Sequence, residues 1–168
     1  MKYDFPAEII NRAGYLIELC RDKNIRLSTI ESCTGGLLSG CLTDIAGSSD
    51  VLDRGFVTYS NEAKYEEVGV SQQSLEKFGA VSDVVAREMC AGAMRRDGVG
   101  AAVSLTGIAG PGGGTDTKPV GLVFIGIATR SAAPVAHRYV FNGDRQEVRA
   151  AAIVEALELL TTAIGESP

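Results

Sequence analysis

The sequence has little positive charge and no long apolar run. Its 168 residues carry 16 lysines and arginines against 21 aspartates and glutamates, which gives a net charge of −5 and an isoelectric point near 4.9. Proteins that bind nucleic acid usually present a clustered basic face, so we expect no nucleic-acid partner. No signal-peptide pattern begins the chain, and no stretch approaches the roughly 20 apolar residues of a membrane-spanning helix. We therefore expect a cytoplasmic protein without a membrane partner.

Patterns that bind metals are also missing. The four cysteines show no CxxC spacing and the sequence has one histidine, which together make a poor zinc site. We therefore expect no metal and no cofactor. Free cysteine is commonly buried, so we expect reduced thiols in or near the core at all four positions. These positions are Cys20, Cys33, Cys41 and Cys90.

Length and apolar content predict one domain over residues 1–168, because 45% hydrophobic residues suffice for one sizeable core and the chain is short for two. Helical and strand periods alternate along it. The predicted helices cover 7–22, 35–47, 61–69, 81–97 and 144–163, and the predicted strands cover 25–30, 54–60, 100–108, 121–129 and 134–142. This order predicts an α/β fold, a three-layer α/β/α sandwich with a mixed, mostly parallel central sheet.

A serine and a threonine stand between a predicted strand and a predicted helix, in the string SCTGG at 32–36. Ligands bind at the carboxyl ends of strands in open α/β sheets, and helix-start N–H groups can hold a developing oxyanion. Ser32 is therefore a candidate nucleophile, with Thr34 and Gly35 as candidate binding residues. Gly35 and Gly36 would let a ligand approach the backbone closely. The alternative is that Ser32 and Thr34 only cap the helix, and the local sequence leaves both interpretations open.

A glycine-rich segment, TGIAGPGGGTDTKPVG at 106–121, separates two apolar strands. It is not a phosphate-binding Walker loop because no GK[ST] follows, and it lacks the GxGxxG spacing of dinucleotide-binding proteins. Loops of this length inside a compact domain are usually functional or mobile. If its preceding strand runs parallel to the strand before Ser32, then Thr106 and Gly107 lie at the same edge of the sheet as Ser32.

The group that would activate Ser32 is harder to identify. His137 lies within a predicted strand, where a structural role is the favoured interpretation. In the string FVTYSNEAK at 56–64, Tyr59 ends a predicted strand and Lys64 follows about one helical turn later. A lysine can act as a base when burial or a neighbouring cation lowers its pKa. A lone lysine is, however, most often a solvated surface residue.

Four strings in order resemble the CinA C-terminal domain family. They are ESCTGG at 31–36, VTYSNEAK at 57–64, TGIAGPGGG at 106–114 and FNGDRQEVR at 141–149. The resemblance extends from about residue 8 to residue 163. Characterised members of this family are nicotinamide mononucleotide deamidases. Many relatives carry an additional N-terminal domain for which this chain has no room, so it resembles the stand-alone form.

The resemblance implies an amidohydrolase that converts nicotinamide mononucleotide to nicotinic acid mononucleotide and ammonia in pyridine nucleotide recycling. It implies Ser32 as the nucleophile, Lys64 as its base and Tyr59 as a nearby catalytic group. We assign substrate binding to Thr34, Gly35, Gly36, Thr106, Gly107 and Arg145. Either Arg145 or the glycine-rich segment would hold the phosphate.

Two other functions stay open at the level of sequence. One is a non-catalytic, nucleotide-binding regulatory module of the competence/damage-inducible type, since a fold does not fix a function. The other is a serine phosphatase or esterase. The combination of Ser32, Tyr59 and Lys64 favours the amidohydrolase, because binding needs neither a nucleophile nor a base. From the resemblance and the glycine-rich apolar surfaces we also expect a homo-oligomer, most simply a homodimer.

Overall fold

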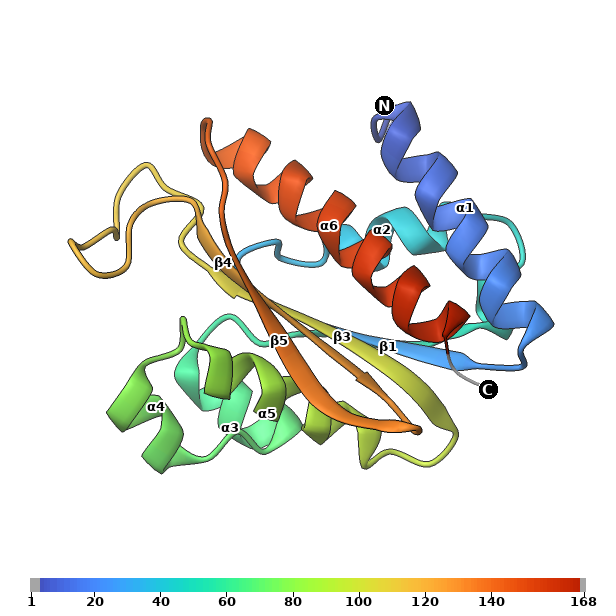
Figure 1. Cartoon of the computed structure of the whole chain (residues 1–168), viewed down its shortest axis with the longest axis horizontal. Coiled ribbons are helices and arrows are strands. Elements are labelled where there is room, and N and C mark those ends of the chain that lie inside the picture. Colours follow the sequence, from blue (N-terminus) through green and yellow to red (C-terminus); the bar gives the residue numbers. More distant parts are fainter. Residues whose placement is uncertain (1–3, 167–168) are drawn as a thin grey trace.

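The computed structural model describes residues 4–166 and folds them into a five-stranded sheet with helices on both faces (Figure 1). Across the sheet the strands stand in the order β2 (Leu52–Val57), β1 (Arg26–Glu31), β3 (Val99–Gly107), β4 (Leu122–Thr129) and β5 (Ala132–Val140). β1 pairs in parallel with β2 and β3, whereas β4 is antiparallel to β3 and β5. The α/β sandwich with a mixed sheet is confirmed. β1, β2, β3 and β5 run in one direction and β4 runs in the other. Two of the four strand pairings are therefore parallel and two are antiparallel.

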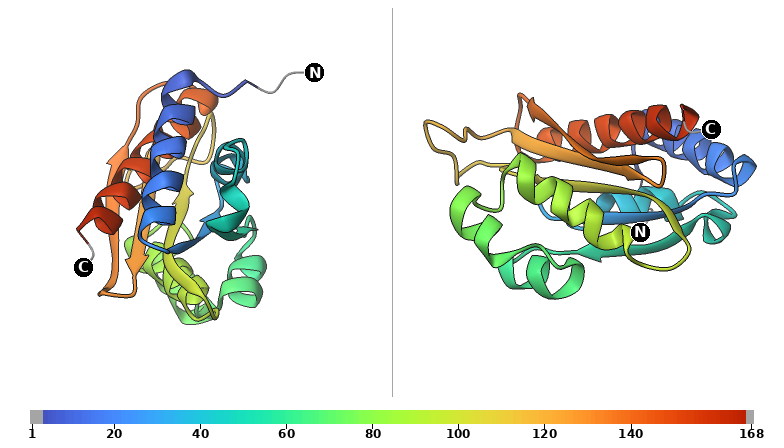
Figure 2. Two further views of the ribbon diagram at one scale, coloured as in Figure 1. Left: turned by 90° about the vertical axis from the view of Figure 1, so that its right-hand side faces the viewer. Right: turned by 60° about the horizontal axis from the view of Figure 1, so that its bottom comes forward.

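Each face of the sheet carries its own group of helices (Figures 1 and 2). One face holds α1 (Ala7–Asp22), α2 (Leu37–Thr43) and α6 (Arg145–Gly165), and the other holds α3 (Asn61–Val68), α4 (Gln72–Phe78) and α5 (Asp83–Met94). A single-turn 3₁₀ helix, η1 (Ser48–Asp50), precedes β2. The larger apolar cluster lies between the sheet and α1 and α6, and the smaller one lies beneath α5.

Most helices begin where the sequence offers a cap. Asp144 and Glu147 form a complete capping box at the start of α6. Ser60 caps α3, with its hydroxyl accepting from the Ala63 N–H at 3.0 Å. Ser71 caps α4, a helix that sequence analysis did not predict. With seven residues, α4 is too short for a helical period to stand out.

The helix expected at 35–47 is shorter, because α2 starts only at Leu37. Gly35 and Gly36 have φ angles of 61° and 96°, in the left-handed region that other residues rarely adopt. These two glycines therefore form a turn after β1 instead of the first helical residues. The turn at 32–36 is the segment that carries Ser32.

The four cysteines are free and buried, as predicted. Within residues 4–166, no three side chains of histidine, cysteine, aspartate or glutamate lie close enough to hold a metal ion. No helix in the same part of the chain has the length and apolar character needed to cross a membrane.

The close packing of α5 on α3 depends on Gly92. A Cβ atom at this position would lie 1.7 Å from the carbonyl oxygen of Val68, the last residue of α3. The absence of a side chain therefore lets the two helices approach backbone to backbone. Because α3 also carries Lys64, this contact helps to fix the position of that lysine above the sheet.

Gly92→Ala should lower the free energy of unfolding by roughly 1–3 kcal/mol, because the added methyl group must push two helices apart. Urea unfolding followed by circular dichroism measures the loss. Gly14→Ala is the matched control, since its new Cβ would have Ile45 Cδ1 as nearest neighbour at 4.0 Å. This control should be as stable as the wild type or up to about 1 kcal/mol more stable. Equal stability of the two variants would contradict the packing argument.

Candidate active site

Ser32 follows β1 directly, at the carboxyl ends of the three parallel strands. Its backbone N–H donates to the Leu105 carbonyl oxygen at 2.9 Å, which continues the pairing of β1 with β3. Its carbonyl oxygen then accepts from the Gly35 N–H at 3.0 Å, so the chain turns immediately afterwards. This turn places Ser32 in the wall of a cavity of about 310 Å³. The N-cap position of α2 belongs to Gly36, so Ser32 is not a helix cap.

Six of the nine predicted site residues line this cavity, although they come from four separate segments of the chain. They are Ser32, Tyr59, Lys64, Thr106, Gly107 and Arg145. The parallel pairing of β1 with β3, on which the sequence prediction depended, brings the first segment beside the third. The glycine-rich segment between β3 and β4 adds Gly110, Gly112 and Gly113 to the lining. Figure 1 shows this segment, in yellow to orange, extending beyond the end of the sheet.

Lys64 is buried, with 1% of its surface exposed, so it is not the solvated lysine that its residue type suggests. Its Nζ donates to the Thr58 carbonyl oxygen at 2.7 Å and to Ser32 Oγ at 3.1 Å. Burial lowers the pKa of Lys64 to about 8, while the neighbouring Cys33 has a smaller effect in the opposite direction. A substantial fraction of this amine is therefore neutral slightly above neutral pH, within hydrogen-bond distance of a serine hydroxyl.

Arg145 lies at the rim of the cavity, where it joins two of its walls. One guanidinium nitrogen donates to the Gly110 carbonyl oxygen at 2.9 Å, and another donates to the Tyr59 hydroxyl oxygen at 3.2 Å. Tyr59 is 62% exposed, and within the described residues no hydrogen bond connects it to Ser32 or Lys64. The tyrosine therefore stands beside the arginine, and its catalytic role stays a prediction.

Thr106 and Gly107 are the last two residues of β3 and not the start of the loop. The Thr106 hydroxyl donates to the Ala80 carbonyl oxygen at 2.8 Å, which ties β3 to the segment before α5. A Cβ atom on Gly107 would lie 2.6 Å from the Leu122 carbonyl oxygen, so glycine permits the close approach of β4. Both residues shape the cavity wall through their backbone contacts.

The turn residues Thr34, Gly35 and Gly36 do not line the cavity. Two of their amides have acceptors within the protein, because Gly35 donates to Ser32 and Gly36 donates to the Glu31 carboxylate. The predicted use of the Gly35 N–H for an oxyanion therefore conflicts with this arrangement. Within residues 4–166, the amides of Cys33 and Thr34 donate to no oxygen. The substrate-binding role of the three turn residues stays a prediction.

Sequence reasoning missed two residues next to Ser32. Cys33 lines the cavity, and burial raises the pKa of its thiol to about 11, so it is not a competing thiolate nucleophile. Glu31 is fully buried behind the turn. Acidic side chains are rarely fully buried without partners, so a glutamate at the end of a predicted inner strand was a signal that the sequence offered.

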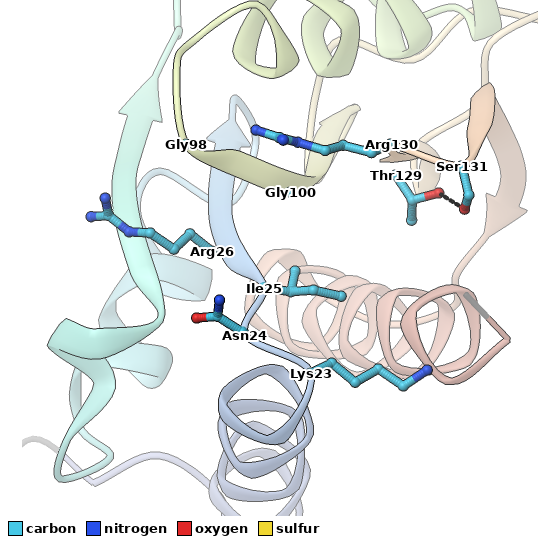
Figure 3. Close-up of a pocket in the computed structure, with 9 residues that line it drawn as sticks. All are labelled: Lys23, Asn24, Ile25, Arg26, Gly98, Gly100, Thr129, Arg130 and Ser131. Atoms are coloured by element: carbon cyan, nitrogen blue, oxygen red, sulfur yellow. Dashed lines mark hydrogen bonds between the residues drawn. The ribbon is translucent and has the colours of Figure 1, made fainter. Parts of the chain in front are cut away.

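A second cavity, of about 360 Å³, lies at the amino ends of the parallel strands (Figure 3). Three cationic side chains line it, but Figure 3 shows that they do not converge on one point. Each has another partner: Lys23 donates to the Gly165 carbonyl oxygen, Arg26 pairs with Asp53 and Arg130 donates to the Val99 carbonyl oxygen. The Ser32 cavity is the stronger candidate for the functional site, because two of its polar side chains, Ser32 and Lys64, are hydrogen-bonded to each other.

Replacing the buried lysine should change how stability depends on pH. Below about pH 8, Lys64 is protonated in both the folded and the unfolded protein; between about pH 8 and pH 10.5 only the unfolded protein keeps the proton. The unfolding free energy of the wild type, relative to Lys64→Met, should therefore rise by roughly 2–3 kcal/mol across that interval. Urea unfolding of both proteins from pH 7 to 10.5 measures the difference. Parallel curves would show that the pKa of Lys64 is not lowered.

The chain is similar to known proteins in both sequence and fold. The model of the CinA C-terminal domain matches residues 11–164. Among solved structures, the competence/damage inducible protein CihA from Agrobacterium tumefaciens has a TM-score of 0.93 and 44% sequence identity. The alignment covers 98% of this chain and 100% of that chain.

Two curated relatives differ in how much of their length corresponds to this chain. The nicotinamide-nucleotide amidohydrolase PncC of Escherichia coli is 43% identical over 92% of this chain and 93% of its own length. A protein of Caldicellulosiruptor saccharolyticus, described as competence-damage inducible, is 48% identical over 89% of this chain. The chain spans only 36% of that relative. With the family match over residues 11–164 and the shared fold, this chain belongs to the CinA C-terminal domain family.

Proposed function

We propose that this protein deamidates nicotinamide mononucleotide to nicotinic acid mononucleotide and ammonia, with Ser32 as nucleophile and Lys64 as base. The observation that carries the proposal is the 3.1 Å contact between Ser32 Oγ and the buried Nζ of Lys64. A hydroxyl beside an amine of lowered pKa is the pair that serine-dependent amide hydrolysis requires. The E. coli relative named as a nicotinamide-nucleotide amidohydrolase supports the same reaction and substrate class.

Acylation begins when neutral Lys64 takes the proton of Ser32 while the serine oxygen attacks the carboxamide carbon. Thr58 supports this step, because its carbonyl oxygen accepts one N–H of the amine and so helps to direct the lone pair towards Ser32. Negative charge develops on the amide oxygen, and the amide of Cys33, which lines the cavity, is the candidate to bind it. Ammonia then leaves with the proton that Lys64 received.

Deacylation uses the same groups, with water as the nucleophile and Ser32 as the leaving group. Lys64, neutral again, takes a proton from water as the water oxygen attacks the ester carbonyl. The bond to Ser32 Oγ breaks and the serine recovers its proton from Lys64. The carboxylic acid so formed gives its proton to solvent and leaves as the carboxylate. Tyr59 is a second proton donor for the leaving group in this proposal, since its oxygen accepts from Arg145 and its own hydrogen remains available.

Arg145 is our proposed phosphate ligand, assisted by the glycine-rich segment. A guanidinium group matches the geometry of phosphate oxygens, and Arg145 lies at the rim of the cavity that Ser32 lines. Its contact with the Gly110 carbonyl oxygen brings it beside the three glycines of the lining, whose backbones a phosphate can approach closely. A cytoplasmic location and a homodimer belong to the same proposal.

Ammonia release from nicotinamide mononucleotide tests the proposal directly. The purified wild type should form nicotinic acid mononucleotide, detected by mass spectrometry, and should act poorly on free nicotinamide, which lacks the phosphate. Ser32→Ala should stay folded and bind the mononucleotide, yet lose at least about a thousandfold in kcat. Near-normal turnover by Ser32→Ala would remove Ser32 as nucleophile. Binding by the wild type without ammonia release would favour a regulatory module.

The pH dependence of the rate tests Lys64 as the base. Because the neutral amine is the active form, kcat should rise with pH through an apparent pKa of about 8. Lys64→Arg keeps the positive charge but cannot lose it, so its rate should fall by about a hundredfold or more. Lys77→Arg, the same change at α4, is the control and should match the wild type. A Lys64→Arg protein with more than about a tenth of the activity would rule out base catalysis by Lys64.

A further inference from the structure

A fully buried carboxylate lies directly beside the proposed nucleophile. Glu31 ends β1, and each of its oxygens accepts two hydrogen bonds. One oxygen accepts from the backbone N–H groups of Gly36 and Leu38, at 3.1 Å and 3.0 Å. The other accepts from the backbone N–H and the hydroxyl of Ser39, both at 2.8 Å. These four bonds offset the cost of removing the carboxylate from water.

Ser39 extends this contact into the sheet. Its oxygen lies 2.6 Å from Thr29 Oγ1, and because Ser39 donates to Glu31, the Thr29 hydroxyl is the donor to Ser39. Gly55 of β2 leaves room for the serine, since a Cβ atom there would lie 2.3 Å from Ser39 Oγ. The start of α2 is thus attached to the carboxyl half of β1 by a closed polar network.

The turn between Glu31 and α2 is also held from α6. A guanidinium nitrogen of Arg149 donates to the Thr34 carbonyl oxygen at 2.9 Å. Glu31 therefore holds the helix-start amides on one side of the turn, and Arg149 holds a carbonyl group on the other. Ser32 has a backbone fixed at both ends, with only its side chain left to meet Lys64.

We propose that Glu31 is a positioning residue for the reaction, holding the turn at 32–36 so that Ser32 Oγ stays within hydrogen-bond distance of Lys64 Nζ. The Glu31 carboxylate also occupies the amino end of α2, where a substrate anion would otherwise be attracted. A substrate phosphate is thereby excluded from that helix end and left to the side of the cavity where Arg145 lies. This role rests on the proposed amidohydrolase function.

Glu31→Gln tests the role with little change in volume. The amide group replaces one acceptor oxygen with an NH₂ donor, which must face donors from the start of α2, so the turn shifts. Displacement of a reacting atom by about 1 Å can cost about a hundredfold, and we expect kcat for nicotinamide mononucleotide to fall by about that factor. KM should stay unchanged because the phosphate side of the cavity is untouched. The midpoint of the pH profile should also stay, because burial sets the pKa of Lys64.

Glu88→Gln is the matched control, because Glu88 holds the start of α4 in the same manner. Its carboxylate accepts from the Ser71 N–H at 2.8 Å and from the Ser74 hydroxyl at 2.6 Å, and it does not line the cavity. Rates are expressed per folded protein, with thermal unfolding followed by circular dichroism. The control should lose stability and keep the wild-type kcat. An equal loss of kcat in both variants would reduce Glu31 to a structural role and overturn the proposal.

The remaining outcomes separate this proposal from the function on which it rests. A wild-type kcat in Glu31→Gln, or a rise in KM in place of the fall in kcat, overturns the positioning role and leaves the amidohydrolase intact. A wild type that releases no ammonia overturns the function and the positioning role together. If Glu31→Gln does not fold, Ser39→Ala decides: kcat lowered at least about threefold with unchanged KM supports the role, and an unchanged kcat overturns it.

Discussion

The burial of one lysine amine is the constraint on which the site depends. The buried Nζ of Lys64 donates one hydrogen bond to the Thr58 carbonyl oxygen and a second to Ser32 Oγ. Thr58 can serve because its own N–H donates to the Glu31 carbonyl oxygen at 2.8 Å, which continues the pairing of β2 with β1. The parallel neighbours β1 and β2 end side by side, and the segments that follow them bring Ser32 and Lys64 together.

Two buried groups of opposite charge therefore act on the same serine without pairing with each other. Glu31 holds the backbone of the turn through the amides of α2, and Lys64 contacts the side chain that the turn presents. Each group has its own hydrogen-bond partners, and these offset the cost of removing that group from water. The backbone of the Ser32 turn and the Ser32 side chain are therefore contacted by different buried groups.

The sequence predicted the elements whose signals are local. The buried face of α1 follows the three- and four-residue spacing of its apolar residues, and the central strands are the expected apolar runs. The prediction was wrong where the backbone leaves the right-handed helical region for the left-handed one. The left-handed turn at Gly35 and Gly36 delays the start of α2 to Leu37. Seven residues were too few to reveal α4.

The sequence by itself determined the α/β class and the place of the SCTGG string between a strand and a helix, because these follow from local periodicity and turn chemistry. It left Ser32 as either a cap or a nucleophile, and Lys64 as either a surface residue or a base. Only the tertiary structure decided that the two side chains meet, since they are 32 positions apart and their contact requires β1 beside β2 and α5 against α3. The lowered pKa of Lys64 was decided there as well, because desolvation is produced by the segments that surround the amine and not by its neighbours along the chain.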